Sequence, residues 1–178
     1  PLKPVSVLFL THAHEDHIGA LIDYTKMGYE GDDVIGTIAS QASKKGHKTY
    51  ILTGDKDSFQ LVDDEGLTTV LIPSKGEIVK FNKQEVYEKM EIYPCQVVDY
   101  KALCGDTSDN IPGIRGIGPK TASALLNEYK TLDEVYENIE NITKKALKEK
   151  LISGKEDAYL SQFLATIVTD LDVAFDFN

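Results

Sequence analysis

Acidic side chains gather at three places along this sequence, each at a spacing that suits metal binding. Carboxylate oxygens are hard ligands of the kind that Mg²⁺ and Mn²⁺ prefer. Two such ions can activate a water molecule and stabilise the leaving oxygen of a phosphoryl displacement. Acidic residues also cap helices and form turns, which is the structural alternative for each group. The three groups are Glu30, Asp32 and Asp33; Asp55 and Asp57; and Asp106 and Asp109.

A glycine-rich stretch follows the last acidic pair directly. Gly113, Gly116 and Gly118 stand in a Gly-x-x-Gly-x-Gly pattern before a helical run. Glycines let the backbone approach a ligand closely, and the new helix offers unpaired N–H groups and the positive end of its dipole. Pro119 suits the first helical position, and Lys120 adds a positive charge. A phosphate cradle beside an acidic pair predicts an enzyme that holds and cuts a phosphodiester backbone.

The elements that must position these residues alternate between strands and helices. Apolar residues at helical spacing follow the first acidic group, and residues 49–53 predict a buried strand that ends at the second. In open α/β sheets, ligand-binding residues collect at such strand ends. Residues 68–72 and 77–81 predict a hairpin. Further helices are predicted over residues 83–90, 93–103, 121–129, 143–152 and 156–169, with Thr131 and Glu134 forming a capping box for another.

Length and composition place the chain among ordinary globular proteins. Its 178 residues allow one domain, or one domain with an appended piece, and 42% are hydrophobic. No apolar run approaches the ~20 residues that span a bilayer, and two cysteines are too few for a disulfide framework. We therefore expect a cytoplasmic monomer that does not contact membranes. The net charge is −10, yet residues 111–155 carry eight basic and six acidic residues, so a local DNA-facing surface is possible.

The N-terminus carries a different metal-binding pattern. An apolar run over residues 5–10 predicts a strand, and three histidines and an aspartate follow it. These residues resemble the HxHxDH motif of the metallo-β-lactamase superfamily, especially its ribonuclease branch, and the resemblance implies zinc ligands. It covers only about the first twenty residues, and the fold's downstream ligands are missing, so a polar loop is the alternative. The implied zinc ligands are His12, His14, Asp16 and His17.

A second resemblance covers most of the chain, from Gly28 to about Asp172. The stretches GYEGDDVIGTIA, ILTGDKDSFQLV, ALCGDTSDNIPGIRGIGPKTASALL and KEDAYLSQFLATIVTD resemble, in order and spacing, the 5′-nuclease domain of bacterial DNA polymerase I, a member of the flap-endonuclease superfamily. The resemblance implies an α/β fold with a mainly parallel central sheet flanked by helices, of the PIN/5′-nuclease type. A helical helix-three-turn-helix region that grips duplex DNA is implied to follow it.

The same resemblance assigns roles to the residues singled out above. The three acidic groups match its metal ligands, which normally hold Mg²⁺, and those matched to catalysis are Asp32, Asp33, Asp55 and Asp57. The glycine-rich stretch matches the element that binds backbone phosphates, where a K⁺ ion can help to bridge. The implied DNA-binding residues are Gly113, Arg115, Gly116, Gly118, Lys120 and Thr121.

The N-terminal segment departs from that family. The family's first strand carries an aspartate and a further aspartate follows it, whereas this segment carries the zinc-type motif instead. We therefore expect an atypical segment over residues 1–27, an α/β nuclease core over 28–109 and a helical DNA-binding region over 110–178. The expected function is Mg²⁺-dependent 5′-3′ exonuclease or flap-endonuclease cleavage of duplex DNA with a 5′ flap, nick or end, impaired by the missing part. The alternatives are a non-catalytic DNA-binding module and a hybrid with a zinc site.

Overall fold

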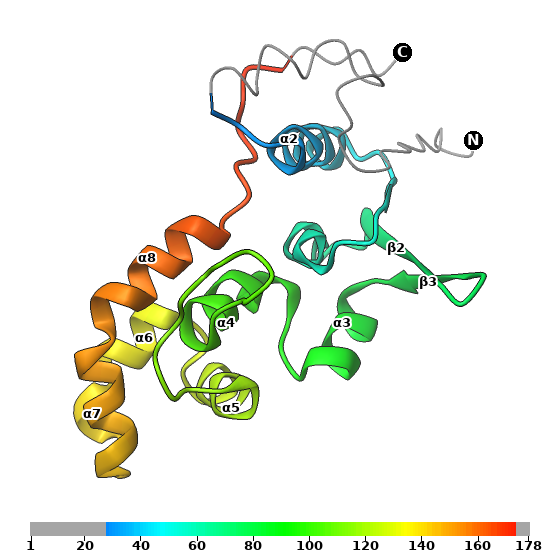
Figure 1. Ribbon diagram of the computed structural model, residues 1–178. Helices are drawn as coiled ribbons and strands as arrows, with labels where there is room; N and C mark the ends of the chain where they lie inside the picture. Colours follow the sequence, from blue (N-terminus) through cyan, green and yellow to red (C-terminus); the bar gives the residue numbers. More distant parts are fainter. Residues whose placement is uncertain (1–27, 174–178) are drawn as a thin grey trace. The chain divides into compact units, whose positions relative to one another are not determined.

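A computed structural model describes residues 28–173 of the chain, which fall into two compact units (Figure 1). The first unit comprises residues 28–86 and 167–173, and the second comprises residues 87–166. None of the helices in this part of the chain is long and apolar enough to cross a bilayer. The zinc ligands predicted at His12, His14, Asp16 and His17 lie outside the described residues.

The first unit is built on a three-stranded mixed sheet with the order β1-β2-β3. β1 (Thr49–Leu52) pairs in parallel with β2 (Thr68–Ser74), and β3 (Glu77–Phe81) returns antiparallel to β2. Lys75 and Gly76 join β2 to β3, and both have positive φ, 49° and 86°. A two-residue type I′ turn needs this backbone, because its twist matches that of the flanking strands. The predicted α/β class and the predicted hairpin are confirmed.

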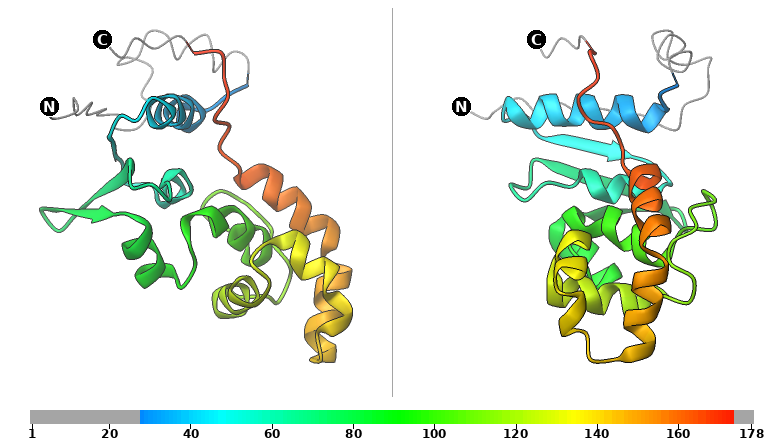
Figure 2. Two further views of the ribbon diagram at one scale, coloured as in Figure 1. Left: turned by 180° about the vertical axis from the view of Figure 1, so that it is seen from behind. Right: turned by 90° about the vertical axis from the view of Figure 1, so that its left-hand side faces the viewer.

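Helix α2 (Gly31–Lys44) packs along β1, as the right-hand view in Figure 2 shows. Acidic residues in its first turn and Lys44 in its last turn both match the helix dipole. Gly46, with φ of 75°, ends the helix and donates to the Ser43 carbonyl at 2.8 Å. The 3-10 helix η1 (Lys56–Leu61) follows β1 and places Phe59 against Phe81, with ring centroids 4.7 Å apart. The core is apolar and includes Val34, Ile35, Ile38, Ala39, Ile51, Phe59 and Val70.

Residues 167–173 form an extended strap that passes beside α2 (Figure 1) and bonds to its side chains. Side chains one helical turn apart on α2 hold its backbone: Thr37 Oγ1 accepts from Leu171 N at 3.2 Å, and Gln41 Nε2 donates to the Val173 carbonyl at 2.9 Å. A Cβ added at Gly36 would lie 2.8 Å from Ile167 Cγ2, so only glycine fits beneath the strap. Leu171 also completes an apolar cluster with Val34 and Ile38 of α2.

The second unit is helical in its described residues. Its helices are α4 (Val97–Cys104), α5 (Pro119–Tyr129), α6 (Leu132–Glu137), α7 (Lys145–Ser153) and α8 (Lys155–Ala165), with 3-10 turns η2 (Pro94–Gln96) and η3 (Ile139–Asn141). The boundary between the units falls within α3 (Lys83–Met90). Helix α4 contacts α5, α6 and α8, so it forms the centre of this unit.

Buried polar side chains fix the second unit around α4. Asp99 is buried, and its two carboxylate oxygens accept from Leu132 N at 3.0 Å and from Gln162 Nε2 at 2.7 Å. The carboxylate therefore caps α6 and binds α8 at once. Gln96 Nε2 donates to the Leu126 and Lys130 carbonyls, each at 2.8 Å, and so closes the C-terminus of α5. Buried polar groups satisfied in this way specify one arrangement of helices.

The predicted helices are largely confirmed, with shifted ends. Pro119 stands at the first position of α5, as predicted, and the Thr131 hydroxyl accepts from Glu134 N at the start of α6, which is one of the two hydrogen bonds of the predicted capping box. The prediction that a helix runs from 156 to 169 is wrong at its end, because α8 stops at Ala165. Beyond that point Val168 N and Leu171 N bond to the α2 side chains of Asp33 and Thr37, and Ile167 N bonds to Gln60 of η1, so these groups are not available to a helix.

Candidate functional site

The first acidic group lies at the N-terminus of α2. Glu30 is the N-cap residue, and its N–H donates to Asp33 Oδ2 at 2.9 Å. The second oxygen, Oδ1 of Asp33, accepts from Val168 N in the strap at 2.8 Å. Each oxygen of Asp33 therefore accepts a hydrogen bond from a backbone N–H: one belongs to Glu30 at the helix start, and the other to Val168, 135 residues further along the chain. Asp33 thus joins the helix start to the strap, and Asp32 beside it is half-buried in the first turn.

The second acidic group follows β1, as predicted for a strand end. Asp55 is exposed and caps η1, since its Oδ1 accepts from Asp57 N at 2.9 Å. Asp57 is half-buried in the first turn of η1. Among the described residues of the first unit, no three metal-ligating side chains bring their ligand atoms within 4.8 Å of one another.

The third acidic group lies in the second unit, directly after α4. Carboxylate oxygens of Asp106 and Asp109 come within 4.8 Å of each other. The ammonium of Lys101 in α4 lies 2.9 Å from Asp106 Oδ2 and 3.3 Å from Asp109 Oδ2. The Lys101 side chain is only 7% exposed, while the two carboxylates are 26% and 46% exposed. A nearly buried cation therefore holds the pair together from below, and the carboxylates face outward.

The electrostatics of this pair favour the charged form of Asp106. Partial burial acts to raise the pKa of the Asp106 carboxyl. Hydrogen bonds from the Lys101 ammonium and from Ser108 N, the latter at 2.9 Å, outweigh it and lower the pKa below its ordinary value. The carboxylate is thus ionised at neutral pH. Hard, ionised oxygen ligands at this spacing suit a divalent ion such as Mg²⁺ or Mn²⁺.

The loop between α4 and α5 crosses itself at two glycines. Asp106 and Ile111 exchange backbone hydrogen bonds of 2.8 and 2.9 Å, and this closes the acidic turn. Gly105 and Gly113 both have positive φ, 74° and 59°, and a Cβ at Gly113 would lie 2.1 Å from Gly105 N. The two backbone segments can pass each other only because neither carries a side chain. Gly113 is buried, and it fixes the acidic turn to the start of the glycine-rich stretch.

Two helices support the glycine-rich stretch from behind. The buried Ser161 hydroxyl of α8 accepts from Gly113 N at 2.9 Å, so this N–H is committed inside the unit. Lys150 of α7 donates to the Gly116 carbonyl at 3.0 Å. Ile114 packs on Gly154, where a Cβ would lie 2.6 Å from Ile114 Cγ2. The glycine-rich stretch, residues 113–118, is therefore held rigidly by these three contacts, and together with residues 119–121 at the start of α5 we call it the platform.

The outer side of the platform carries the residues suited to bind an anion. Arg115, Gly116, Gly118 and Lys120 are exposed, and Thr121 is half-buried. Thr121 N bonds back to the Gly118 carbonyl at 3.0 Å. The backbone N–H of Lys120, also in the first turn of α5, has no partner among the described residues. Of the predicted DNA-binding residues, Gly113 alone turns inward, and its role is the close backbone crossing.

Sequence reasoning missed the residues that support the site. Lys101 interrupts an apolar helical face five residues before Asp106. Because lysines are rarely buried unless they are paired, a lysine at such a position indicates a nearby carboxylate partner. Ser161 and Lys150 lie in helices more than thirty residues beyond the stretch they support, and nothing in their local sequence points to it. Their contacts follow from the packing of α7 and α8.

Comparison with known proteins identifies both parts of the chain. Residues 18–91 match the model for the 5′-3′ exonuclease N-terminal resolvase-like domain, and residues 92–178 match that for the 5′-3′ exonuclease C-terminal SAM fold. DNA polymerase I of Synechocystis sp. is 50% identical over 153 residues, which are 83% of this chain and 15% of that protein. DNA polymerase I of Bacillus subtilis is 44% identical over 147 residues, 82% of this chain and 16% of that protein. The chain thus spans about a sixth of these relatives.

Solved structures share the fold at low sequence identity. T5 5′-exonuclease with bound zinc superposes with a TM-score of 0.68 and 21% identity, over 80% of this chain and 51% of that one. The catalytic core of Rad2 in complex with DNA substrate gives a TM-score of 0.53 and 17% identity, over 83% and 50%. At these identities the likeness establishes the fold, a resolvase-like part followed by a helical part.

Proposed function

Because the chain belongs to the 5′-3′ exonuclease family, we propose that it hydrolyses the phosphodiester backbone of DNA as a 5′-3′ exonuclease or flap endonuclease. The observation that carries the proposal is the loop in which Asp106 and Asp109 stand beside an exposed, rigidly supported glycine-rich platform. Acidic ligands and a phosphate-binding backbone are the two parts that metal-dependent cleavage needs. The proposed substrate is duplex DNA with a 5′ flap, nick or end, and the proposed location is the cytoplasm.

The carboxylates are the groups that would hold Mg²⁺ or Mn²⁺. Candidates are Glu30, Asp32, Asp33, Asp55 and Asp57 in the first unit and Asp106 and Asp109 in the second. When bound, such ions supply an activated water and neutralise charge on the leaving oxygen. The chain's own contribution is to orient these ligands: Lys101 holds the last pair, Asp55 caps η1, and Asp33 fastens the helix that carries Asp32.

The platform would hold the DNA backbone independently of sequence. Exposed glycine backbone at Gly116 and Gly118 and the charges of Arg115 and Lys120 address phosphates, not bases. A K⁺ ion bridging backbone carbonyls and a phosphate would strengthen the same contact. Binding of this kind weakens as salt rises. As a division by function, distinct from the two structural units, we propose residues 28–109 as the nuclease core and residues 110–178 as the DNA-binding region.

A DNA-binding module without catalysis is the second candidate. It is favoured by Lys101, whose ammonium offsets one of the two negative charges of Asp106 and Asp109. A bound cation at that pair would have to share the carboxylates with Lys101. The zinc site predicted at His12, His14, Asp16 and His17 stays a prediction, because those residues lie outside the described part of the chain.

Cleavage and binding of one substrate separate the two candidates. The full chain is incubated with 5′-labelled flap DNA and Mg²⁺, and product release and binding are both measured. We expect cleavage that Asp55→Asn abolishes while binding persists, because asparagine keeps the oxygen that accepts from Asp57 N. Asp64→Asn is the matched control, since Asp64 is an exposed carboxylate paired with Lys83 at 2.8 Å. Binding without cleavage by the wild type supports the inert module, and absence of binding at low salt eliminates both candidates.

A further inference from the structure

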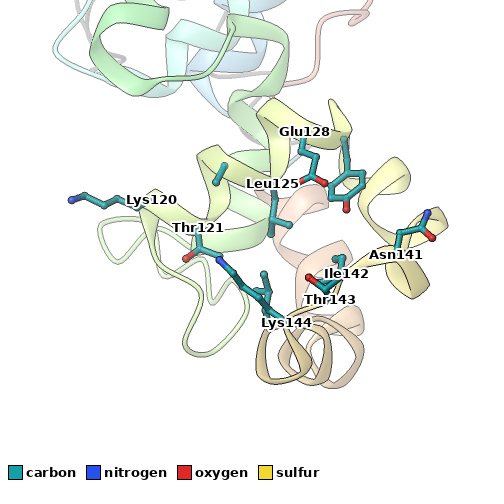
Figure 3. Close-up of a pocket in the computed structure, with 11 residues that line it drawn as sticks. Lys120, Thr121, Leu125, Glu128, Asn141, Ile142, Thr143 and Lys144 are labelled. Carbon is teal, nitrogen blue, oxygen red and sulfur yellow. The ribbon is translucent and has the colours of Figure 1, made fainter.

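A pocket of about 290 Å³ opens in the second unit along α5 (Figure 3). One wall is the outer face of α5, from Lys120 and Thr121 to Glu128, and the other is the segment between η3 and α7, including Thr143 and Lys144. In Figure 3 the Lys144 side chain extends toward Thr121 at the start of α5. The pocket therefore begins where the glycine-rich platform ends.

The charges around this pocket are divided between its two ends. Lys120 and Lys144 stand at the end nearest the platform, and neither makes an ion pair with a described carboxylate. Lysines next to Lys144 are paired: Lys148 with Glu140 at 2.7 Å and Lys145 with Glu149 at 3.9 Å. Glu128 and Asn141 lie at the other end. An anion is attracted to the lysine end and repelled from the Glu128 end.

The pocket floor is apolar. Leu125 and Ile142 are 4% and 9% exposed, and Leu147 and Ala124 extend the same surface. A ligand that fits must combine an anionic group with a less polar body of a few heavy atoms. A sugar–phosphate unit has this composition, with the phosphate at the Lys144 ammonium beside Thr121 and the deoxyribose over the floor.

We propose that this pocket binds one sugar–phosphate unit of the DNA strand whose neighbouring phosphate is held by the platform. The proposal rests on the proposed DNA binding. Lys120 and Thr121 belong to both surfaces, so a strand leaving Gly118 meets the pocket without a gap. Lys144, which no sequence motif pointed to, becomes a specific phosphate contact. The Thr121 and Thr143 hydroxyls supply hydrogen-bond donors at the same end.

Salt-dependent DNA binding by the full chain tests the proposal. Each lysine–phosphate contact releases counterions and contributes about 0.9 to the slope of log affinity against log salt for duplex DNA. We expect Lys144→Ala to lower that slope by about 0.9 and to weaken binding about eightfold at ~0.1 M salt. Lys145→Ala is the matched control, because Lys145 is the next residue, carries the same charge and does not line the pocket. It should leave the slope unchanged.

A charge-neutral variant tests the shape of the pocket separately. Ala124 is exposed and lines the wall, so Ala124→Phe fills the space without altering charge or the buried core. We expect weaker DNA binding with helix content unchanged by circular dichroism. The proposal is overturned if Lys144→Ala and Lys145→Ala behave alike, or if Ala124→Phe binds as the wild type does. A wild type that binds no DNA overturns the proposed function itself.

Discussion

The Lys101→Met substitution probes the buried cation beneath the acidic turn. Methionine keeps the apolar stem packed in α4 but removes the ammonium that lies 2.9 Å from Asp106 and 3.3 Å from Asp109. Hydrogen bonds to charged groups contribute about 1.5–3 kcal/mol, and exposed ion pairs about 0–1 kcal/mol. Because Lys101 is 7% exposed but its partners are 26% and 46% exposed, we place the loss in unfolding free energy at about 2 kcal/mol.

Divalent ions should offset part of this loss. Without Lys101 the two carboxylates face each other with no cation between them, so Mg²⁺ should stabilise Lys101→Met more than it stabilises the wild type. At ten times its dissociation constant a ligand stabilises the folded state by about 1.4 kcal/mol. The assay is urea unfolding followed by circular dichroism, with Mg²⁺ and with a chelator.

A surface ion pair in the same unit provides the control for Lys101→Met. Lys148 and Glu140 form a 2.7 Å pair in which the glutamate side chain is 82% exposed, so Lys148→Met should cost less than about 1 kcal/mol and show no response to Mg²⁺. The reasoning is refuted if the two variants lose equal stability, or if Mg²⁺ stabilises both to the same extent.

Three further substitutions test the supports of the site. Gly113→Ala should lower the free energy of unfolding by about 3 kcal/mol or more, because its Cβ would lie 2.1 Å from Gly105 N at positive φ. The control is Gly118→Ala, whose Cβ would meet open space and which should cost less than about 1 kcal/mol. Urea unfolding measures both. Asp33→Asn should cost about 1–3 kcal/mol, since its amide NH₂ cannot accept from the N–H that one Asp33 oxygen now binds; an unchanged unfolding midpoint would contradict the strap. Burial and a 2.7 Å hydrogen bond to Asp133 raise the pKa of Tyr159 to about 12. Because the pKa of Tyr159 is higher in the folded state, its contribution to stability is complete below the ordinary tyrosine value near 10 and is lost as the pH rises toward 12. In an absorbance titration of tyrosinate, Tyr159→Phe should lack one group that titrates late.

Local chemistry made much of the fold predictable. The turn at Lys75 and Gly76, the stop of α2 at Gly46 and the start of α5 at Pro119 depend on residues whose backbone preferences act within a few positions. The platform was predictable for the same reason, since its glycines and the following helix are contiguous. The acidic pair after α4 was likewise found from spacing alone.

Contacts distant in sequence could not be predicted. Asp33 was assigned to a metal site by its motif, and only the position of Val168 assigns its second oxygen to the strap. Gly113 N–H was expected to face a phosphate, but Ser161, 48 residues later, takes it. Lys144 and α5 share a pocket only because η3 turns the chain back on itself. These roles arise from packing, for which the local sequence carries no signal.

The direction and metal dependence of cleavage test the central claim most directly. Nicked duplex DNA labelled at the 5′ end of the nicked strand, and the same duplex labelled at its 3′ end, are each incubated with the full chain in Mg²⁺ and in a chelator. The account predicts short 5′-labelled products in Mg²⁺, progressive shortening of the 3′-labelled strand from its 5′ side, and neither in chelator. Release of short 3′-labelled products first, or cleavage that persists in chelator, would contradict it.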